Sequence, residues 1–368
     1  MPRLIACAVF LASLSIGASS AQALEAQQIN DAQFGVVEKA AQLGVAEGKQ
    51  AGSDAFVVKA QALLGRRSIS PGVIDGFDGE NYRKAIAQFR RQEGLGQGED
   101  LDEDVWRALG NSGTDQIVRE YTINEKDTAY EFADEIPSDY AKQSKMKRLA
   151  FTSPIEMHAE RFHMSEGLLR AMNPKAAFKA GETLLIVAIK REMRKGAASL
   201  IEANKTTGMV VVYAVDQRIL ASYPATIGSE TTPSPEGEHM ITRIAKNPAY
   251  YYDPAKNFQQ GKNTGRLTLP PGPNNPVGSV WIALSKPTYG IHGTPEPSKV
   301  SKTSSHGCIR LTNWDAEELA DMVQPGVVVR FTNCICMRQP DDHCLRSQRA
   351  CSRFWYHQTL KHSALKAY

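Results

Sequence analysis

The sequence predicts a multidomain α+β protein in which small helical units precede a β-rich domain. The chain has 368 residues, 42% of them hydrophobic, which is enough to bury more than one core. Apolar residues recur at helical spacing in the first third of the chain. From Gly208 onward, short apolar runs are separated by Gly and Pro turns, without a regular alternation of strand and helix.

The charge balance excludes some classes of partner. Lys and Arg number 43 and Asp and Glu number 40, a net charge of +3 without long blocks of one sign. Such a balance does not favour nucleic-acid binding. No apolar run after the N-terminal segment approaches the ~20 residues that a membrane-spanning helix needs. We therefore expect no nucleic-acid partner and no membrane span in the mature chain.

The N-terminal segment has the organisation of a secretory signal peptide. Arg3 is followed by an apolar run over residues 4–16 and then by Ala21-Gln22-Ala23. A charged start, a short apolar run and an A-x-A site are typical of exported proteins, and the run is too short for a membrane anchor. The sequence therefore predicts cleavage near Ala23 and export.

The cysteine count follows from this export. Without Cys7, which lies in the signal peptide, five of the six cysteines remain. An odd number in an oxidising compartment implies at least one free thiol, and Cys308 is the candidate because it stands apart from the others. The C-terminal extension, residues 333–368, is expected to be poorly ordered, with two disulfides or a zinc site as alternatives for Cys334, Cys336, His343, Cys344 and Cys351.

Residues 24–53 read as a leader that is either a linker or a first helix, and residues 54–110 as a small unit of three helices. This unit resembles the peptidoglycan-binding domain 1 family, which implies wall binding. The alternative is a plain helical bundle in which the aromatic residues are core. The resemblance is carried by Gln61, Leu64, Asp75, Gly76, Gly79, Ala85, Phe89, Gly94, Leu95, Trp106 and Leu109.

Residues 111–144 are expected to be a linker, and residues 145–190 a second small module. Two short helices meet at Met164-Ser165, with Ser165 as the N-cap of the second, and a strand follows over residues 183–189. This order resembles the end of a LysM module, a fold that packs two helices on a short hairpin and binds N-acetylglucosamine polymers. His158 and His163 are interpreted as packing or surface residues, because no metal-ligand pattern accompanies them.

The β-rich domain is predicted over residues 207–332. Strands are expected at 209–215, 219–223 and 327–331, with a helix over 315–323. Within it, His292-Gly293-Thr294 precedes Ser305-His306-Gly307-Cys308. A free cysteine has a pKa of ~8.5, so acyl transfer needs a histidine to activate it and amide donors for the oxyanion. From spacing alone, an inert cysteine and a core histidine remain alternatives.

This string closely resembles the catalytic motif of the L,D-transpeptidase family, also called the YkuD domain. Further strings over 207–332 agree with the family, around Pro233, Leu269, Asn275 and Asn313. The resemblance implies a β sandwich or barrel-like catalytic domain. It also implies that Cys308 attacks the carbonyl before the terminal D-Ala of a peptidoglycan tetrapeptide stem.

The resemblance assigns further roles. His292 would be the general base, oriented by the backbone carbonyl of Gly293, and the amides of Gly307 and Cys308 would form the oxyanion hole. Arg310 would hold either the active-site loop or a substrate carboxylate. The remaining candidates are Ser305 and His306, which match motif positions, and Tyr289 and Trp281, which either line the cleft or pack in the core.

The sequence therefore predicts an exported, periplasmic cysteine transpeptidase that cross-links peptidoglycan and needs no metal, nucleotide or organic cofactor. Water or a lysine of an outer-membrane protein could replace the stem amine as acceptor. A wall-binding protein without catalysis is the alternative from another class. A papain-like protease is disfavoured because it needs Cys before His in the chain, and here Cys308 follows His292.

Overall fold

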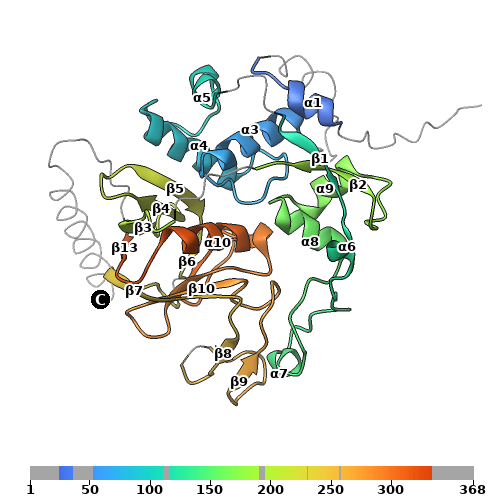
Figure 1. Ribbon diagram of the computed structural model, residues 1–368. Helices are drawn as coiled ribbons and strands as arrows, with labels where there is room; N and C mark the ends of the chain where they lie inside the picture. Colours follow the sequence, from blue (N-terminus) through green and yellow to red (C-terminus); the bar gives the residue numbers. More distant parts are fainter. Residues whose placement is uncertain are drawn as a thin grey trace, which may run out of the picture.

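The computed structural model describes residues 25–35, 53–110, 116–189, 195–229, 231–256 and 258–333. The signal peptide and the cysteines of the C-terminal extension lie outside these residues. Figure 1 shows the first helices above the large sheet, the α/β module beside it, and the β8–β9 hairpin with α7 at the opposite end. In the described part of the chain, no helix is both long and apolar enough to cross a membrane.

Four helices form the first unit, and their ends follow from local chemistry. The Asp54 side chain accepts the Phe56 and Val57 amides at the start of α3, and Gly94 ends α4 in the left-handed region at φ 69°. The leader contributes a true helix, whose Ile29 is fully buried. The helices are α1 (Ala26–Asp31), α3 (Ala55–Arg66), α4 (Glu80–Glu93) and α5 (Glu103–Ala108).

The polar residues behind the first resemblance hold a turn in place. The Gln61 Oε1 atom accepts the amides of Asp75, at 3.1 Å, and Gly76, at 2.9 Å. Gly76 has φ +77°, and a Cβ there would lie 2.9 Å from Val58, so a glycine is required. These residues therefore stabilise the helical unit.

The α/β module begins earlier than the sequence suggested. Residues 111–144 are not simply a linker, because strand β1 (Val118–Thr122) pairs antiparallel with β2 (Thr183–Val187). Only one residue of β1 is buried, so the strand lacks the apolar alternation that would have revealed it. The helices between the two strands are α6 (Glu125–Thr128), α7 (Tyr140–Gln143), α8 (Pro154–Arg161) and α9 (Glu166–Met172).

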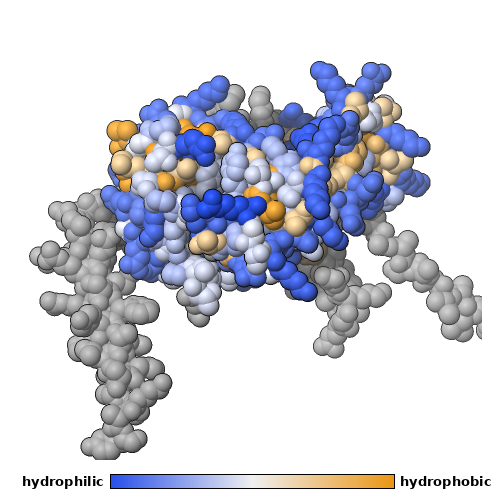
Figure 2. All heavy atoms as spheres, turned by 90° about the horizontal axis from the view of Figure 1, so that it is seen from below, coloured by the Kyte–Doolittle hydropathy of each residue, from blue (hydrophilic) through white to orange (hydrophobic). Residues whose placement is uncertain are grey.

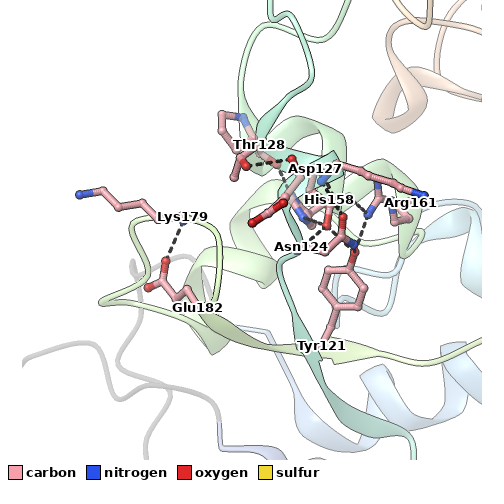
Figure 3. Close-up of polar contacts among 11 residues, drawn as sticks. Tyr121, Asn124, Asp127, Thr128, His158, Arg161, Lys179 and Glu182 are labelled. Atoms are coloured by element: carbon pink, nitrogen blue, oxygen red, sulfur yellow. Dashed lines mark hydrogen bonds and ion pairs between the residues drawn. The ribbon is translucent and has the colours of Figure 1, made fainter.

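A buried polar cluster fastens α6 to β1 and α8 (Figure 3). Asp127, whose side chain is 5% exposed, accepts the Tyr121 hydroxyl at 2.5 Å and Arg161 Nη1 at 2.7 Å. His158 is buried beside it, and its Nδ1 donates to the Pro154 carbonyl at 2.7 Å. His158 is thus a packing residue, as the sequence suggested.

The two N-terminal units are not separate folding cores. Leu64 and Phe89 of the helical unit belong to one apolar cluster with Leu168 and Leu184 of the α/β module. Shared burial of this kind makes each unit depend on the other for its stability. The two modules expected from the sequence therefore share a single hydrophobic core, and we call them together the N-terminal body.

The C-terminal half is β-rich, as predicted. Its main sheet has nine strands in the order β5-β4-β3-β13-β7-β10-β11-β12-β6, with parallel pairing only between β13 and β3 and between β11 and β12 among the described strands. A small separate sheet pairs β8 (Tyr250–Tyr252) with β9 (Leu267–Leu269). The main strands and the helix packed on them are β3 (Leu200–Asn204), β4 (Met209–Tyr213), β5 (Ile219–Pro224), β6 (Thr226–Ile227), β7 (Gly237–Lys246), β10 (Val280–Leu284), β11 (Gly290–His292), β12 (Ile309–Arg310), β13 (Val328–Thr332) and α10 (Asn313–Met322).

The sequence predicted that this domain starts at residue 207, but in the structure it starts earlier. Strand β3 occupies residues 200–204 and pairs in parallel with β13, at the other end of the domain. The polar residues Glu202 and Asn204 interrupt the apolar pattern by which this strand could have been predicted, although both are buried. The expected hairpin of residues 209–215 and 219–223 is confirmed as β4 and β5.

The N-terminal body docks on the catalytic half through polar contacts. Ser70 Oγ donates to the fully buried Asp315 of α10 at 2.8 Å, and the Ser70 amide donates to the Ser222 carbonyl at 2.8 Å. The rings of His163 and Trp314 stack at 5.1 Å. Helix α10 is therefore held by both N-terminal units, through Ser70 of the helical unit and His163 of the α/β module.

Candidate active site

Strand register brings the segments that carry the candidate nucleophile and base side by side. In the parallel pair β11·β12, His292 lies opposite Arg310. Cys308 comes two residues before Arg310, and Gly290 two residues before His292, so these two are also level. Opposite residues share a face, so His292 and Arg310 lie together, and the Arg310 charge acts on both the His292 ring and the Cys308 thiol. The Gly290 backbone interacts with the Cys308 thiol, and a Cβ at Gly290 would lie 2.6 Å from the Trp281 ring.

The His292 ring is held in one orientation. Its Nδ1 lies 2.6 Å from the Gly293 carbonyl oxygen, and Trp281 stacks on the ring at 5.6 Å. A carbonyl oxygen only accepts hydrogen bonds, so Nδ1 carries the proton and Nε2 keeps its lone pair. The ring is therefore arranged to accept a proton through Nε2.

Burial keeps this histidine neutral. His292 is only 6% exposed, and burial together with the nearby Arg310 charge lowers its pKa to about 4, although the hydrogen bond to Gly293 acts in the opposite direction. At neutral pH the imidazole is thus uncharged and available as a base.

Cys308 is also neutral at rest. Its thiol lies 3.6 Å from the Thr288 carbonyl oxygen, to which it donates. Burial raises the pKa of the Cys308 thiol to about 11. The hydrogen bond from the Gly290 amide and the Arg310 charge lower this pKa, but their effect is smaller than that of burial. The resting pair is therefore a thiol and an imidazole, not an ion pair, and proton transfer must accompany attack on a substrate.

The peptide before the cysteine is fixed in direction. Gly307 has φ +99°, and a Cβ there would lie 2.7 Å from the Tyr289 ring. Ser234 Oγ donates to the Gly307 carbonyl at 2.7 Å. Because the C=O and the following N–H of a trans peptide point in opposite directions, the Cys308 amide points away from Ser234. Ser234 was not identified from the sequence, where it looked only like part of a turn.

Ser305 connects the cysteine loop to the segment that contains Gly228 and Thr232. Its Oγ donates to the Cys308 carbonyl at 2.6 Å and accepts the Gly228 amide at 2.8 Å. Thr232 Oγ1 donates to the Ser305 carbonyl at 3.1 Å. Ser305 is 3% exposed, so it supports the loop from beneath and does not face the cleft.

Arg310 and His306 lie at the edge of the site. Arg310 makes one long hydrogen bond, 3.4 Å to Thr303 Oγ1, and its buried Nε has no partner in the described structure. The exposed His306 stacks on Phe258 of the hairpin loop, with ring centres 3.9 Å apart. The structure thus brings Arg310 close to the Cys308 and His292 side chains, whereas His306 faces the hairpin.

A cleft of about 600 Å³ lies beside the pair. It includes Thr288, the acceptor of the thiol, and Trp281, which stacks on His292. Tyr289 packs against the core and Gly307 instead. The other lining residues are Arg243, Ala245, Pro248, Ala249, Tyr250, Tyr251, Tyr252, Asp253, Lys256, Arg266, Leu267, Thr268 and Val277.

Asn313 is the main positioning residue that the sequence did not reveal. Its Oδ1 accepts the amides of Thr294 and Ser279, both at 3.0 Å, and so fixes the turn that carries Gly293. Its Nδ2 donates to Glu160 of α8. The sequence analysis named Asn313 only within a string that agrees with the family, because none of these contacts is local.

No group of three or more His, Cys, Asp or Glu side chains that could hold a metal ion occurs among the described residues. Cys308 is a free cysteine. The cysteines and the histidine of the C-terminal extension lie outside the described part of the chain.

A protein-family model matches the part of the chain that carries this site. The model of the L,D-transpeptidase catalytic domain, YkuD, matches residues 198–330. That range begins before β3 and ends within β13, so it covers the main sheet and α10.

Curated relatives match about a third to a half of the chain. A Bacillus licheniformis protein named as the L,D-transpeptidase YkuD is 30% identical over 181 residues, which are 48% of this chain and 93% of that protein. The Bacillus subtilis protein YqjB, also named as an L,D-transpeptidase, is 33% identical over 35% of this chain and 69% of its own length. Among solved structures, L,D-transpeptidase 3 of Mycobacterium tuberculosis aligns with 42% of this chain and 76% of its own, at 15% identity and a TM-score of 0.32.

Proposed function

The chain belongs to the L,D-transpeptidase (YkuD) family of transferases with a cysteine nucleophile, and from that premise we propose that Cys308 forms an acyl-enzyme with peptidoglycan stem peptides. The observation that supports the proposal is the β11·β12 register, in which His292 lies opposite Arg310, two residues after Cys308, together with the hydrogen bond from the His292 ring to the Gly293 carbonyl. The family acts on peptidoglycan, and we propose tetrapeptide stems as the donor.

The first half-reaction follows from the neutral resting pair. His292 Nε2 takes the thiol proton as the Cys308 sulfur attacks the carbonyl that precedes the terminal D-Ala, and the carbonyl oxygen becomes an oxyanion. We propose the Cys308 amide, whose direction is set by the Ser234 contact to the Gly307 carbonyl, as a donor for this oxyanion. When the intermediate collapses, the C–N bond breaks, His292 returns the proton to the leaving nitrogen, and D-Ala departs.

The second half-reaction releases the thioester. The amine of another stem attacks the carbonyl, gives its proton to His292, and displaces the Cys308 sulfur, which recovers a proton from the imidazolium. The products are a cross-linked peptide and the resting enzyme. A water molecule or a protein lysine would complete the same sequence with a different product.

Arg310 has the properties of a carboxylate anchor in this scheme. Its guanidinium is half-buried, holds one 3.4 Å contact to Thr303, and has an unpartnered Nε among the described residues. Stem peptides carry carboxylates close to the scissile bond, and a guanidinium binds them in a two-pronged manner. Of the two roles open from the sequence, we therefore propose substrate binding.

Export and wall binding complete the proposal. The signal peptide of residues 1–23 would deliver the protein to the periplasm. The strand-helix-helix-strand order of β1, α8, α9 and β2 supports a LysM-like module, and the turn held by Gln61 supports a peptidoglycan-binding unit. Binding units next to a catalytic site raise the local substrate concentration.

Intact-protein mass spectrometry tests the acyl-enzyme. Wild type and Cys308→Ala are incubated with a soluble disaccharide tetrapeptide and, separately, with a carbapenem. We expect an adduct on the wild type alone, with a mass equal to the tetrapeptide donor minus D-Ala. The absence of any adduct on folded wild type would favour a wall-binding protein without catalysis. Adding acceptor amines and scoring cross-linked against hydrolysed product then identifies the acceptor.

A further inference from the structure

One segment of the α/β module leaves its own fold and reaches the catalytic half. We call residues 129–152, between α6 and α8, the strap. Tyr140 of α7, in the middle of the strap, meets the rings of Tyr250 and Tyr252 edge-on, with ring centres 6.0 and 5.3 Å apart. Figure 1 shows α7 beside β9, at the end of the molecule farthest from α1.

The strap and the hairpin share a small core of their own. Leu149 is fully buried with Tyr252 and Leu269, and this cluster is distinct from the main core of the catalytic sheet. The Leu149 amide also donates to the Pro271 carbonyl at 3.0 Å. The strap thus supplies the apolar surface on which the hairpin packs.

Directional contacts fix the two segments to each other. The Tyr140 amide donates to Gln260 Oε1 at 3.1 Å, and Gln260 Nε2 donates to the Ser138 carbonyl at 2.8 Å. Asn263 Nδ2 donates to Asp139 Oδ1 at 2.8 Å. On the strap these bonds involve two backbone groups and the Asp139 side chain, and on the hairpin loop they involve side chains, so they define one relative position.

The hairpin needs such support. Its strands have three residues each, and an isolated two-stranded hairpin is marginally stable at best in water. Seen from this end, the surface of the molecule is mostly hydrophilic with small apolar patches (Figure 2), which agrees with an apolar contact closed between strap and hairpin. Without the strap, the buried faces of Tyr252 and Leu269 would meet water.

The supported hairpin is a wall of the catalytic cleft. Tyr250 and Tyr252 line the same cleft as Trp281 and Thr288, the residues that contact His292 and Cys308. Tyr140 therefore touches two residues of the cleft wall, and one of them, Tyr250, lies within electrostatic range of Cys308.

The far side of the hairpin reaches the cysteine loop. Phe258 stacks on His306, two residues before Cys308, and its ring centre is 6.3 Å from that of Tyr140. The Tyr140 phenol also lies within electrostatic range of the Arg310 guanidinium. Tyr140 thus contacts both strand β8 and the hairpin loop whose Phe258 stacks on His306.

We propose that the strap is a working part of the catalytic site, and that Tyr140 is a positioning residue that sets the hairpin wall against which the stem peptide binds. The inference rests on the proposed function, because it assumes that the cleft beside Cys308 takes the donor. The N-terminal body would then serve in the reaction itself, in addition to any binding of the cell wall.

The test uses three full-length variants and two readouts. Tyr140→Ala removes the ring and Tyr140→Phe keeps it. Tyr130→Ala is the matched control, because the Tyr130 ring packs on Phe132 and Phe151, which both belong to the strap. One readout is KM and kcat for acylation by a soluble disaccharide tetrapeptide. The other is hydrogen exchange of the amides of β8 and β9, which needs no substrate.

For Tyr140→Ala we expect KM to rise about tenfold, the order expected for losing an aromatic pair, with a smaller change in kcat and faster exchange in β8 and β9. Tyr140→Phe should stay within about twofold of wild type, because the contacts that carry the argument are ring contacts. Tyr130→Ala should behave like wild type in both readouts.

Unchanged KM and exchange in Tyr140→Ala would overturn the inference, and so would equal effects of Tyr140→Ala and Tyr130→Ala. Failure of the proposed function gives a different result, in which the wild type forms no thioester at all. In that case the exchange data still decide whether Tyr140 holds the hairpin.

Discussion

At the residue scale, the candidate site is built to be neutral at rest. Burial lowers the pKa of His292 to about 4 and raises that of Cys308 to about 11, and both shifts favour the uncharged form. Arg310 works against the cysteine shift and in favour of the histidine shift, because a positive charge favours a thiolate and disfavours an imidazolium. The nucleophile is therefore activated during attack and not stored as a thiolate.

This arrangement predicts two different pH profiles. Alkylation of Cys308 by iodoacetamide depends on the thiolate, so its rate should rise about tenfold per pH unit between pH 7 and 10. Acylation by the tetrapeptide depends on neutral His292, so it should lose rate only as pH falls toward the histidine pKa of about 4. Peptide-level mass spectrometry measures both rates at Cys308.

Arg310→Gln provides the internal comparison. Removing the positive charge should raise the Cys308 pKa further and slow alkylation at a given pH. An alkylation rate that is already level at pH 7 would contradict the neutral pair and indicate a thiolate–imidazolium pair.

At the element scale, short elements are held by side chains more than by their own length. Helix α6 has four residues, and a helix that short has no stability of its own. Asp127 fixes it by accepting the Tyr121 hydroxyl and Arg161 (Figure 3). Burial alone would raise the Asp127 pKa, but these hydrogen bonds outweigh it, and the pKa lies below its usual value.

Asp127→Ala should lower the free energy of unfolding of the N-terminal body by roughly 1–3 kcal/mol, because buried donors lose their acceptor. Denaturant unfolding followed by hydrogen exchange in β1 and β2 measures this loss. The folded-state pKa is depressed, so the wild-type advantage should be complete above the unfolded pKa of ~4 and be lost as pH falls through the lower folded-state pKa.

Asp134→Ala is the control for this prediction, since Asp134 lies on the exposed surface of the strap. Its effect should stay within about 0.5 kcal/mol. Equal stabilities of the two variants would show that the Asp127 cluster does not hold α6.

At the scale of the whole molecule, the N-terminal body and the catalytic half act as one structure. The helical unit and the α/β module share one apolar core. Between the two halves, Ser70 donates to the buried Asp315 and Asn313 donates to Glu160. The strap also packs on the hairpin. Removing the N-terminal body would therefore expose buried groups on the catalytic half. A truncated enzyme should lose activity on soluble muropeptides as well as on intact sacculi.

Calorimetry of the full chain should accordingly show a single main transition. Ser70→Ala should lower its midpoint, with a loss of roughly 1–3 kcal/mol for leaving the buried Asp315 carboxylate without this donor. Ser304→Ala, at an exposed position, is the matched control. Two widely separated transitions in the wild type would indicate independent domains and contradict this picture.

The sequence alone predicted what is encoded in short strings. Helical spacing and caps predicted the first unit, turn residues predicted the β-rich half, and the string from Ser305 to Arg310 pointed to the acylation site. Each of these signals depends on neighbours within a few residues, where backbone geometry and side-chain chemistry act directly.

The remaining features depend on contacts between distant segments. Strand β1 needs β2 as its partner, Asn313 is connected to the turn after His292, and the strap reaches a hairpin more than a hundred residues later. No local pattern records such a partner, because the free energy of these contacts arises only when separate elements pack together. The position of the cleft wall is therefore a property of the assembled molecule.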